Sequence, residues 1–373
     1  MRITGARVFD VTMGFTSRDL CLDGRLISTD STDGQTYDAA DCYIIPGLTD
    51  LHFHGCKGHD FSDGDSDGLE AIAQYQLSRG VTQICPAVMT LSEESLVQIC
   101  RTAVDYRAAK RPGAALYGIN LEGPFLAPEQ KGAHNENWLR APDIALLHRL
   151  IEASDGLIKL VSVAPELPGA LNFIEAVADE VTVSLSHTAA DFEVASAAFR
   201  AGARQVTHLC NAMSPFYHRE PGVVGAALDA PDCMVELICD GIHIHPAMVR
   251  AIFTMFAKRV ILISDSMRAA GMPDGSYALG DQTVTVQGGR ASLADGTLAG
   301  STCDLMACLK NAVSMGIPLA AAVTAAAVNP ARAIGIYSRL GSLEPGKLAN
   351  IAVLDKNLDL KAVFFLGKLV QEY

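Results

Sequence analysis

Short hydrophobic runs rich in β-branched residues recur along the chain, separated by longer amphipathic stretches. The runs cover residues 43–54, 81–88, 115–123, 157–166, 181–187, 204–209, 233–241 and 259–265. The stretches between them, such as LEAIAQYQLSRG and PAMVRAIFTMFAKR, have the periodicity of amphipathic helices. Strands that alternate with helices pair in parallel, and eight such units are the number that closes a TIM barrel. The pattern therefore predicts an α/β fold built on a (β/α)8 barrel.

Both ends of the chain show a different pattern, in which apolar and polar residues alternate. MRITGARVFD and DLCLDGRLIS lie near the start, and GSLEPGKLANIAVLD and KAVFFLGKLV lie near the end. Alternation is typical of strands with one buried face, and neither end alone could bury its apolar face. We therefore expect a small β-sandwich domain built from both termini, residues 1–44 plus 340–373, beside a barrel domain at 45–339. Residues 277–301 alternate around a Gly-Gly turn and predict a hairpin inserted before the last helices.

The composition narrows the class of protein. The chain has 373 residues, 49% of them hydrophobic and 19% charged, which is ordinary for a globular protein. The net charge of −13 disfavours a broad basic face for nucleic acid. The first residues contain no long apolar core and no run is long enough to cross a bilayer, so we expect neither a secretory signal nor a membrane anchor. Ten cysteines without a CxxC motif indicate reduced thiols, and hence a cytoplasmic protein.

Residues that can bind metal gather at the ends of the hydrophobic runs. His52 and His54 close the first run, Glu122 the third, His187 the fifth, His208 the sixth and Asp265 the eighth, and His243 follows the seventh. Each alone could be a helix cap, a hydrogen-bonded histidine or a surface residue. Barrel enzymes, however, place their chemistry at the carboxyl ends of the strands. Burying so many polar groups at one rim costs about 1–3 kcal/mol each unless they are paired, and a divalent cation would offset that cost.

The types of residue at this rim favour a hydrolytic metal site. If His52 and His54 lie on one strand, their side chains point to the same face. Imidazole and carboxylate without thiolate suit Zn²⁺, and Fe²⁺, Mn²⁺ or Co²⁺ could also bind. An incomplete protein shell leaves a position for water, and Asp265 is placed to serve as general base and acid. The reaction class that follows is hydrolysis of a C–N or related bond.

Longer motifs carry a resemblance to a known family. PGLTDLHFHG, NLEGPFL, KGAH, LSHT, VTHLCNAM, DGIHI, ISDSM, LAGS, NPARAIGI and LEPGKLANIAVLD occur in this order along nearly the whole chain. The chain thereby resembles the N-acetylglucosamine-6-phosphate deacetylases of the amidohydrolase superfamily. The resemblance implies a metal-dependent TIM barrel, usually a homodimer, that hydrolyses the acetyl group from an amino-sugar phosphate in amino-sugar catabolism. Glu122, His187 and His208 match the family's metal ligands and Asp265 matches its acid/base. Glu122 stands where many amidohydrolases use a carboxylated lysine.

The resemblance also assigns residues that contact the substrate. The matching positions are Ala133, His134, Asn211, Ala212, Arg219, His243, Leu298, Ala299 and Gly300. Arg219 resembles a phosphate contact that reaches the active site of the neighbouring subunit, whereas without the resemblance an ion pair with Glu220 is an equally good interpretation. His243 could polarise the acetyl carbonyl or hold a sugar hydroxyl. Some family members carry amides at the His-x-His positions and use one metal. We therefore expect one ion, and hypothesise that His52 and His54 can hold a second, with Glu122 bridging the two ions and Asp265 assisting.

Other functions remain open from the sequence. The same scaffold could serve an N-acetylgalactosamine-6-phosphate deacetylase or a hydrolase of cyclic amides, although KGAH, CNAM and Arg219 favour a phosphosugar. A metal-free scaffold protein is a further alternative. It is disfavoured because Glu122, His187, His208 and Asp265 are all present.

Overall fold

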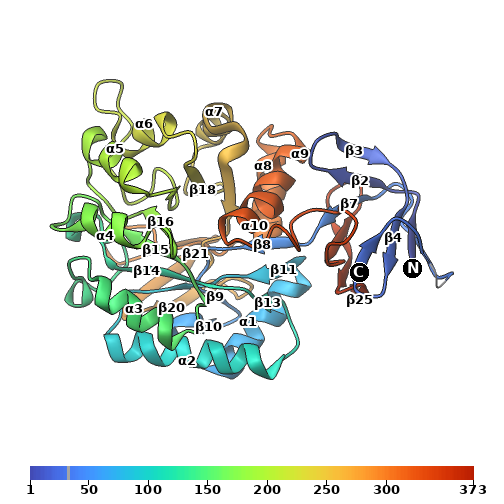
Figure 1. Ribbon diagram of the computed structural model, residues 1–373, viewed down its shortest axis with the longest axis horizontal. Helices are drawn as coiled ribbons and strands as arrows, with labels where there is room; N and C mark the ends of the chain where they lie inside the picture. The colour runs from blue at the N-terminus through green and yellow to red at the C-terminus, as the bar shows by residue number, and fades with distance from the viewer. Residues whose placement is uncertain (32–33) are drawn as a thin grey trace.

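A ring of parallel strands forms the larger part of the computed structural model, which describes residues 1–31 and 34–373 (Figure 1). All eight hydrophobic runs contain a strand of this ring. The strands are β8 (Leu48–Asp50), β11 (Val81–Ile84) with β12 (Ala87–Val88), β13 (Ala115–Leu116) with β14 (Ile119–Phe125), β15 (Ile158–Val163), β16 (Thr182–Leu185), β17 (Gln205–Val206), β18 (Met234–Ile238) and β19 (Val260–Ile263). Neighbouring strands pair in parallel from β8 to β19. Beyond β19 the chain returns to the first strand, where the Asp265 N–H donates to the His52 carbonyl at 3.0 Å.

A helix follows each strand position of the ring. These helices are α1 (Ser66–Ser78), α2 (Glu93–Ala109), α3 (Ile144–Ala153), α4 (Ala170–Val177), α5 (Phe192–Ala201), α6 (Gly222–Asp229), α7 (Pro246–Phe256) and α8 (Leu305–Ser314). A last helical segment runs through α9 (Leu319–Val323), a π-helical turn (Thr324–Val328) and α10 (Asn329–Ala333). Five of the helices begin at an Asp or Ser whose side chain accepts a backbone N–H, namely Asp65, Ser92, Asp143, Asp191 and Asp304. The α/β barrel predicted from the alternation is therefore confirmed.

The two ends of the chain form a second, smaller β body beside the barrel, at the right of Figure 1. One sheet has the order β5 (Leu26–Ser28), β4 (Leu20–Asp23), β1 (Arg2–Thr4), β6 (Thr36–Asp38). The other has the order β25 (Lys368–Glu372), β24 (Leu360–Phe365), β23 (Ile351–Leu354), β7 (Tyr43–Pro46), β2 (Arg7–Asp10), β3 (Gly14–Ser17). Between the two sheets, the ring centroids of Tyr37 and Phe364 lie 5.2 Å apart. The run 43–54 thus divides between the two bodies, and the boundary expected after residue 44 falls inside β7.

An antiparallel insertion lies between β19 and α8. It contains β20 (Gly275–Leu279), β21 (Gln282–Gln287) and β22 (Arg290–Ser292), so the predicted hairpin has a third strand. Gly288 and Gly289 form the turn between β21 and β22 with φ of 58° and 78°, a conformation that favours glycine. Side chains of the insertion, such as Val284, pack on Met89 and Met267 in a hydrophobic cluster separate from the main core.

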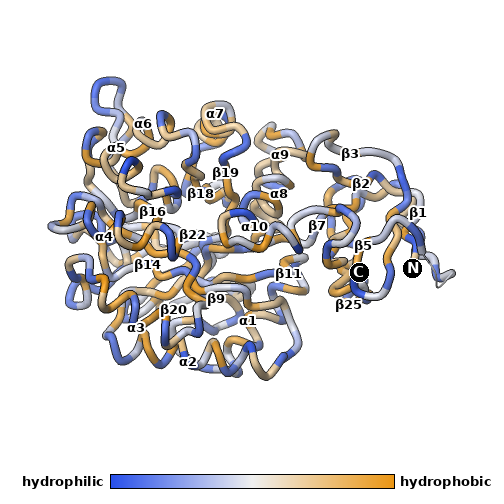
Figure 2. The backbone as a smooth tube through the Cα atoms, viewed as in Figure 1, coloured by the Kyte–Doolittle hydropathy of each residue, from blue (hydrophilic) through white to orange (hydrophobic). Residues whose placement is uncertain are grey.

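Hydrophobic residues are frequent along the barrel strands, and along the helices they alternate with hydrophilic residues (Figure 2). β9 (Gly55–Cys56) and β10 (His59–Asp60) form a small antiparallel pair after β8. The loop before α6 is hydrophilic and projects from the barrel (Figures 1 and 2). Over residues 1–31 and 34–373, no helix combines the length and the hydrophobicity needed to cross a membrane.

Candidate active site

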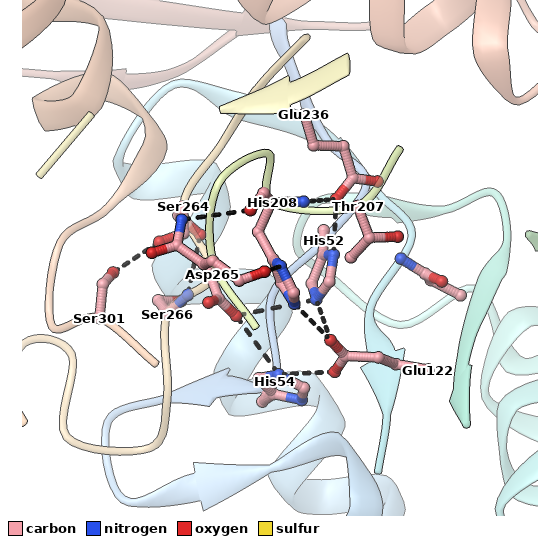
Figure 3. A network of polar contacts seen from close by, with 12 residues as sticks. His52, His54, Glu122, Thr207, His208, Glu236, Ser264, Asp265, Ser266 and Ser301 are labelled. Atoms are coloured by element: carbon pink, nitrogen blue, oxygen red, sulfur yellow. Dashed lines mark hydrogen bonds and ion pairs between the residues drawn. The ribbon is translucent and has the colours of Figure 1, made fainter. Parts of the chain in front are cut away.

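Glu122 lies among histidines at the carboxyl end of the barrel (Figure 3). It is the fourth residue of β14 and is 2% exposed. Its Oε1 lies 3.3 Å from Nε2 of His52, 3.3 Å from Nε2 of His187 and 3.2 Å from Nε2 of His208. Its Oε2 lies 3.3 Å from Nε2 of His54. Four imidazoles from three different strand ends therefore meet one carboxylate, as expected if each hydrophobic run ends at the same rim.

His187 and His208 are held so that both present Nε2 to Glu122. Nδ1 of His187 lies 2.7 Å from the Gln130 carbonyl, and Nδ1 of His208 lies 3.2 Å from the Asn211 carbonyl. A carbonyl can only accept, so each Nδ1 carries a proton, and Nε2 is the ring nitrogen that faces Glu122. The two Nε2 atoms are 3.1 Å apart. Two imidazole nitrogens and a carboxylate oxygen then converge on one point, an arrangement that a bound cation would stabilise.

The backbone at this rim is strained at three of these residues. His187, His208 and Asp265 have φ of 44°, 27° and 47°, in the left-handed region that non-glycine residues seldom adopt. Such conformations cost about 1–3 kcal/mol each and are concentrated at functional sites. Each of these residues lies two positions after the end of a barrel strand. The turn there redirects its side chain over the mouth of the barrel.

His52, His54 and Asp265 form a second group on the other side of Glu122. Asp265 Oδ1 lies 3.4 Å from Nε2 of His54 and 3.7 Å from Nε2 of His52. The two histidines lie beyond β8, which ends at Asp50, so the expectation that both are strand residues is wrong. They converge because this segment is bound to the residues that follow the last strand, β19: His54 N–H donates to the Ser266 carbonyl at 2.7 Å.

The charges in the protein alone are strongly coupled. Burial would raise the pKa of Glu122, but the charge of His52 and hydrogen bonds from the other histidines hold it well below its usual range. Burial would likewise raise the pKa of Asp265, yet the hydrogen bond from His54 and the nearby imidazoles lower it. Burial would lower the pKa of His54, whereas its contacts with Asp265 and Glu122 raise it to about 10. For His187, burial prevails and lowers the pKa to about 4. Both carboxylates are therefore ionised at neutral pH.

The donor set fits a divalent cation. Glu122, His187 and His208 form one group and His52, His54 and Asp265 another, and within each group the ligand atoms lie within 4.8 Å of one another. The buried atoms His52 Nε2 and His54 Nδ1 have no hydrogen-bond partner. Nitrogen ligands about 2.0–2.1 Å from Zn²⁺ in a tetrahedral site are about 3.3 Å apart, close to the separations around Glu122. Residues from both groups could therefore hold a metal ion.

A cavity of about 480 Å³ opens onto these groups. All but one of the residues expected to contact substrate line it: Ala133, His134, Asn211, Ala212, His243, Leu298, Ala299 and Gly300. Leu279 of the β20–β22 insertion and Met89 add an apolar wall. Arg219 is the exception, because it is exposed on the loop before α6 and lines a separate hollow of about 590 Å³.

Two histidines of the cavity are oriented by neighbours that the sequence reasoning missed. Nδ1 of His243 lies 2.7 Å from Asp240 Oδ2, and Asp240 Oδ1 accepts the N–H groups of Ile242 and His243 at 2.9 Å. Nδ1 of His134 faces the Thr90 hydroxyl at 2.8 Å. Asp240 belongs to the DGIHI motif and could have been proposed from it. Thr90 lies in a loop 44 residues before His134, and nothing in the sequence links the two residues.

A third missed residue is Glu236, which lies inside the barrel on β18. Its Oε2 is 2.8 Å from Nδ1 of His52, and its side chain is fully buried. The available signal was a charged residue in the middle of the apolar run CMVELICDG.

Comparisons with known proteins show which family this chain is similar to. The family model described as "Amidohydrolase family" matches residues 43–370. The chain is 38% identical over 328 residues to N-acetylgalactosamine-6-phosphate deacetylase of Escherichia coli O157:H7, covering 87% of each chain. It is 36% identical over 357 residues to N-acetylglucosamine-6-phosphate deacetylase of Vibrio furnissii, covering 93% of this chain and 88% of the relative.

Solved structures agree over the whole chain. A mutant N-acetyl-D-glucosamine-6-phosphate deacetylase of Mycobacterium smegmatis, in complex with N-acetyl-D-glucosamine-6-phosphate, is similar with a TM-score of 0.92 and 32% identity over 99% of both chains. N-acetylglucosamine-6-phosphate deacetylase of Pasteurella multocida is similar with a TM-score of 0.93 and 29% identity, covering 100% of this chain and 99% of that chain.

Proposed function

The chain belongs to the amidohydrolase family, and on that premise we propose that it hydrolyses N-acetyl-D-glucosamine 6-phosphate to glucosamine 6-phosphate and acetate. One observation carries the chemistry: Glu122, the imidazoles of His187 and His208, and the carboxylate of Asp265 face a cavity of about 480 Å³. The relatives from Vibrio furnissii and Mycobacterium smegmatis bear the name of this activity. The substrate class follows from these relatives and from the cavity residues of this chain that belong to the KGAH, CNAM and LAGS motifs.

We propose that Glu122, His187 and His208 hold the catalytic divalent ion, with Zn²⁺ favoured by the nitrogen and oxygen donors and Fe²⁺, Mn²⁺ or Co²⁺ as alternatives. His52 and His54, with Glu122 and Asp265, offer a place for a second ion. A bound divalent ion acidifies water and polarises a carbonyl group.

Asp265 is the proposed general base and acid. Its ionised carboxylate, next to the ligand group, takes a proton from the attacking water and later returns it to the amine that leaves. His243 is held by Asp240 with its Nε2 side toward the cavity, where it can donate to the acetyl carbonyl or to a sugar hydroxyl. The remaining cavity residues, Ala133, His134, Asn211, Ala212 and Leu298 to Gly300, position the sugar so that its amide meets the water.

Arg219 is proposed to bind the substrate phosphate of the neighbouring subunit in a homodimer. It lines a different hollow from the catalytic cavity of its own chain, and Tyr217 beside it is 58% exposed. A guanidinium offers a fork of donors to phosphate. Substituting Arg219→Gln should raise KM for the phosphorylated sugar about tenfold to hundredfold, on the typical weight of hydrogen bonds to charged groups, without changing the rate on the unphosphorylated sugar. Equal effects on both sugars would exclude phosphate binding by Arg219, and a monomer in solution would exclude its action across an interface.

The second candidate is N-acetylgalactosamine-6-phosphate deacetylase, because the Escherichia coli relative at 38% identity bears that name. Acetate release should be measured on both epimeric sugar phosphates and on the unphosphorylated sugar, with bound ions quantified in the same sample. A higher kcat/KM for the gluco epimer supports the proposal, and a higher value for the galacto epimer replaces it with the second candidate. Absence of acetate release from either phosphosugar by the metal-loaded protein would overturn both.

We also place this reaction in amino-sugar catabolism in the cytoplasm. The ten cysteines are all free thiols, which is typical of a reducing compartment.

A further inference from the structure

Glu236 is a buried carboxylate that the proposed reaction does not use. It lies on β18 with its side chain inside the barrel, beneath the mouth where the ligand groups meet (Figure 3). Its side chain is 0% exposed. Burying a carboxylate is costly unless hydrogen bonds satisfy it, so its partners indicate what it does.

The partners of Glu236 link the two ligand groups. Oε2 is 2.8 Å from Nδ1 of His52 and accepts the backbone N–H of His208 at 3.3 Å. Oε1 accepts from Nε2 of Gln205 at 2.6 Å. His52 belongs to the group with Asp265, whereas His208 belongs to the group with Glu122 and His187. The shortest contact with a ligand residue is the one to the His52 ring.

The contact with His52 determines which nitrogen faces the ligands. Both oxygens of Glu236 already accept hydrogen bonds, from Gln205 and the His208 N–H, so Nδ1 of His52 is the donor in its contact with Oε2. Nε2 is then the atom that points toward Glu122, 3.3 Å away, and Asp265, 3.7 Å away, and it has no hydrogen-bond partner of its own. An amide at position 236 could satisfy Gln205 or the His208 N–H, but it could also turn its NH₂ group toward His52 and remove this constraint.

We propose that Glu236 is a positioning residue that holds the His52 ring with Nε2 directed at the second divalent ion. This inference rests on the proposed two-ion site. His54 differs from His52, because its Nδ1 has no partner. Glu236 therefore supplies the group of His52, His54 and Asp265 with its one anchored imidazole.

The test is the binding of Zn²⁺ to Glu236→Gln in competition with a chromogenic chelator. Partners that orient metal-binding histidines typically account for 10–100-fold in affinity. We expect the weaker of the two Zn²⁺ dissociation constants to rise about 10–100-fold, and the tighter one to stay unchanged. Glu166→Gln is the matched control. Glu166 accepts from Thr188 and Ala189 beside His187 and does not contact His52, so neither dissociation constant should change in that variant.

A double-mutant cycle separates positioning from a general structural role. Adding Glu236→Gln to His52→Ala should cause no further loss of Zn²⁺ affinity, because the ring to be positioned is already gone. Equal weakening of both ions, or the same loss in the His52→Ala background, would overturn the proposal. If Glu236→Gln does not fold, Glu236→Asp, whose carboxylate is one methylene shorter, should show a smaller loss confined to the second ion.

The outcome also separates this inference from the proposed function. A wild-type protein that binds one Zn²⁺ per chain even with excess metal, yet releases acetate, would overturn the role of Glu236 and leave the deacetylase in place. Two bound ions without acetate release would overturn the deacetylase, and the selective loss in Glu236→Gln would still support the positioning role.

Discussion

Four histidines of the barrel mouth are anchored in two different ways. His187 and His208 direct Nδ1 to main-chain carbonyls, whereas His52 and His243 direct Nδ1 to the buried carboxylates of Glu236 and Asp240. A carbonyl fixes the ring without adding a charge, so burial keeps the imidazole neutral and lowers the pKa of His187 to about 4. A carboxylate opposes burial, and the pKa of His243 is raised above its ordinary value.

This difference indicates how one residue type serves two tasks at one rim. A neutral imidazole with a free lone pair is a metal ligand, and a protonated one is a hydrogen-bond donor to substrate. His52 combines both features, because a carboxylate anchors it while its Nε2 faces Glu122 and Asp265. We therefore expect the group of His187 and His208 to bind its ion without help from the other group.

Among the substitutions that test this expectation, Asp265→Asn should have the largest effect on activity. Losing general acid–base catalysis typically costs 10²–10⁴-fold, so kcat for acetate release should fall by about that factor. One ion per chain should remain, because Asp265 does not belong to the group of Glu122, His187 and His208. Kinetics and elemental analysis of the same preparation measure both quantities. Loss of all bound metal would show that the two groups are not independent.

A matched pair of ligand substitutions should give the next largest difference. His187→Ala removes a neutral ligand of the first group and should lower acetate release by more than about 100-fold, since even outer partners of such ligands account for 10–100-fold. His52→Ala should retain one ion and lose less activity. Metal content and kcat/KM should be measured for the two variants side by side. A larger loss in His52→Ala than in His187→Ala would contradict the comparison.

Much of this site could be predicted from sequence because barrel strands all end at one rim. Glu122, His187, His208 and Asp265 each stand at or just beyond the end of a hydrophobic run, so parallel pairing brings them together. The path of His52 and His54 could not be predicted the same way, because β8 ends at Asp50 and hydrogen bonds to residues beyond β19 place both histidines.

The supporting residues were hidden for a different reason. Strands buried on both faces are apolar throughout, so the sequence does not reveal which residues of β18 point into the barrel. Glu236 was therefore missed, because its charge within an apolar run indicated no partner. The division of the run 43–54 into β7 and β8 was equally hidden, because only Gly47 separates the two strands although they belong to different sheets.

The smallest expected effect is on the pH dependence of the free energy of unfolding. It tests the contact between His243 and the Asp240 carboxylate. The substitution Asp240→Asn keeps an oxygen that can accept the N–H groups of Ile242 and His243 but removes the charge. In the wild type, burial would lower the pKa of His243, yet the hydrogen bond and charge of Asp240 raise it above 6.5. Burial would raise the pKa of Asp240, whereas its contacts with His243 lower it below 3.8.

The signs of these two shifts fix the pH window. The raised pKa of His243 adds stability that is complete below 6.5 and is lost as the pH rises through the folded-state value. The lowered pKa of Asp240 adds stability that is present above 3.8 and is lost as the pH falls through its folded-state value. The free energy of unfolding should therefore differ between wild type and Asp240→Asn by about 1.5–3 kcal/mol near pH 5.5, and by less at pH 8.5. Urea unfolding at both pH values measures the difference, and His243→Gln serves as the control, because Asp240→Asn should show no such pH dependence in that background. A difference that grows with pH would mean that Asp240 does not stabilise the protonated form of His243.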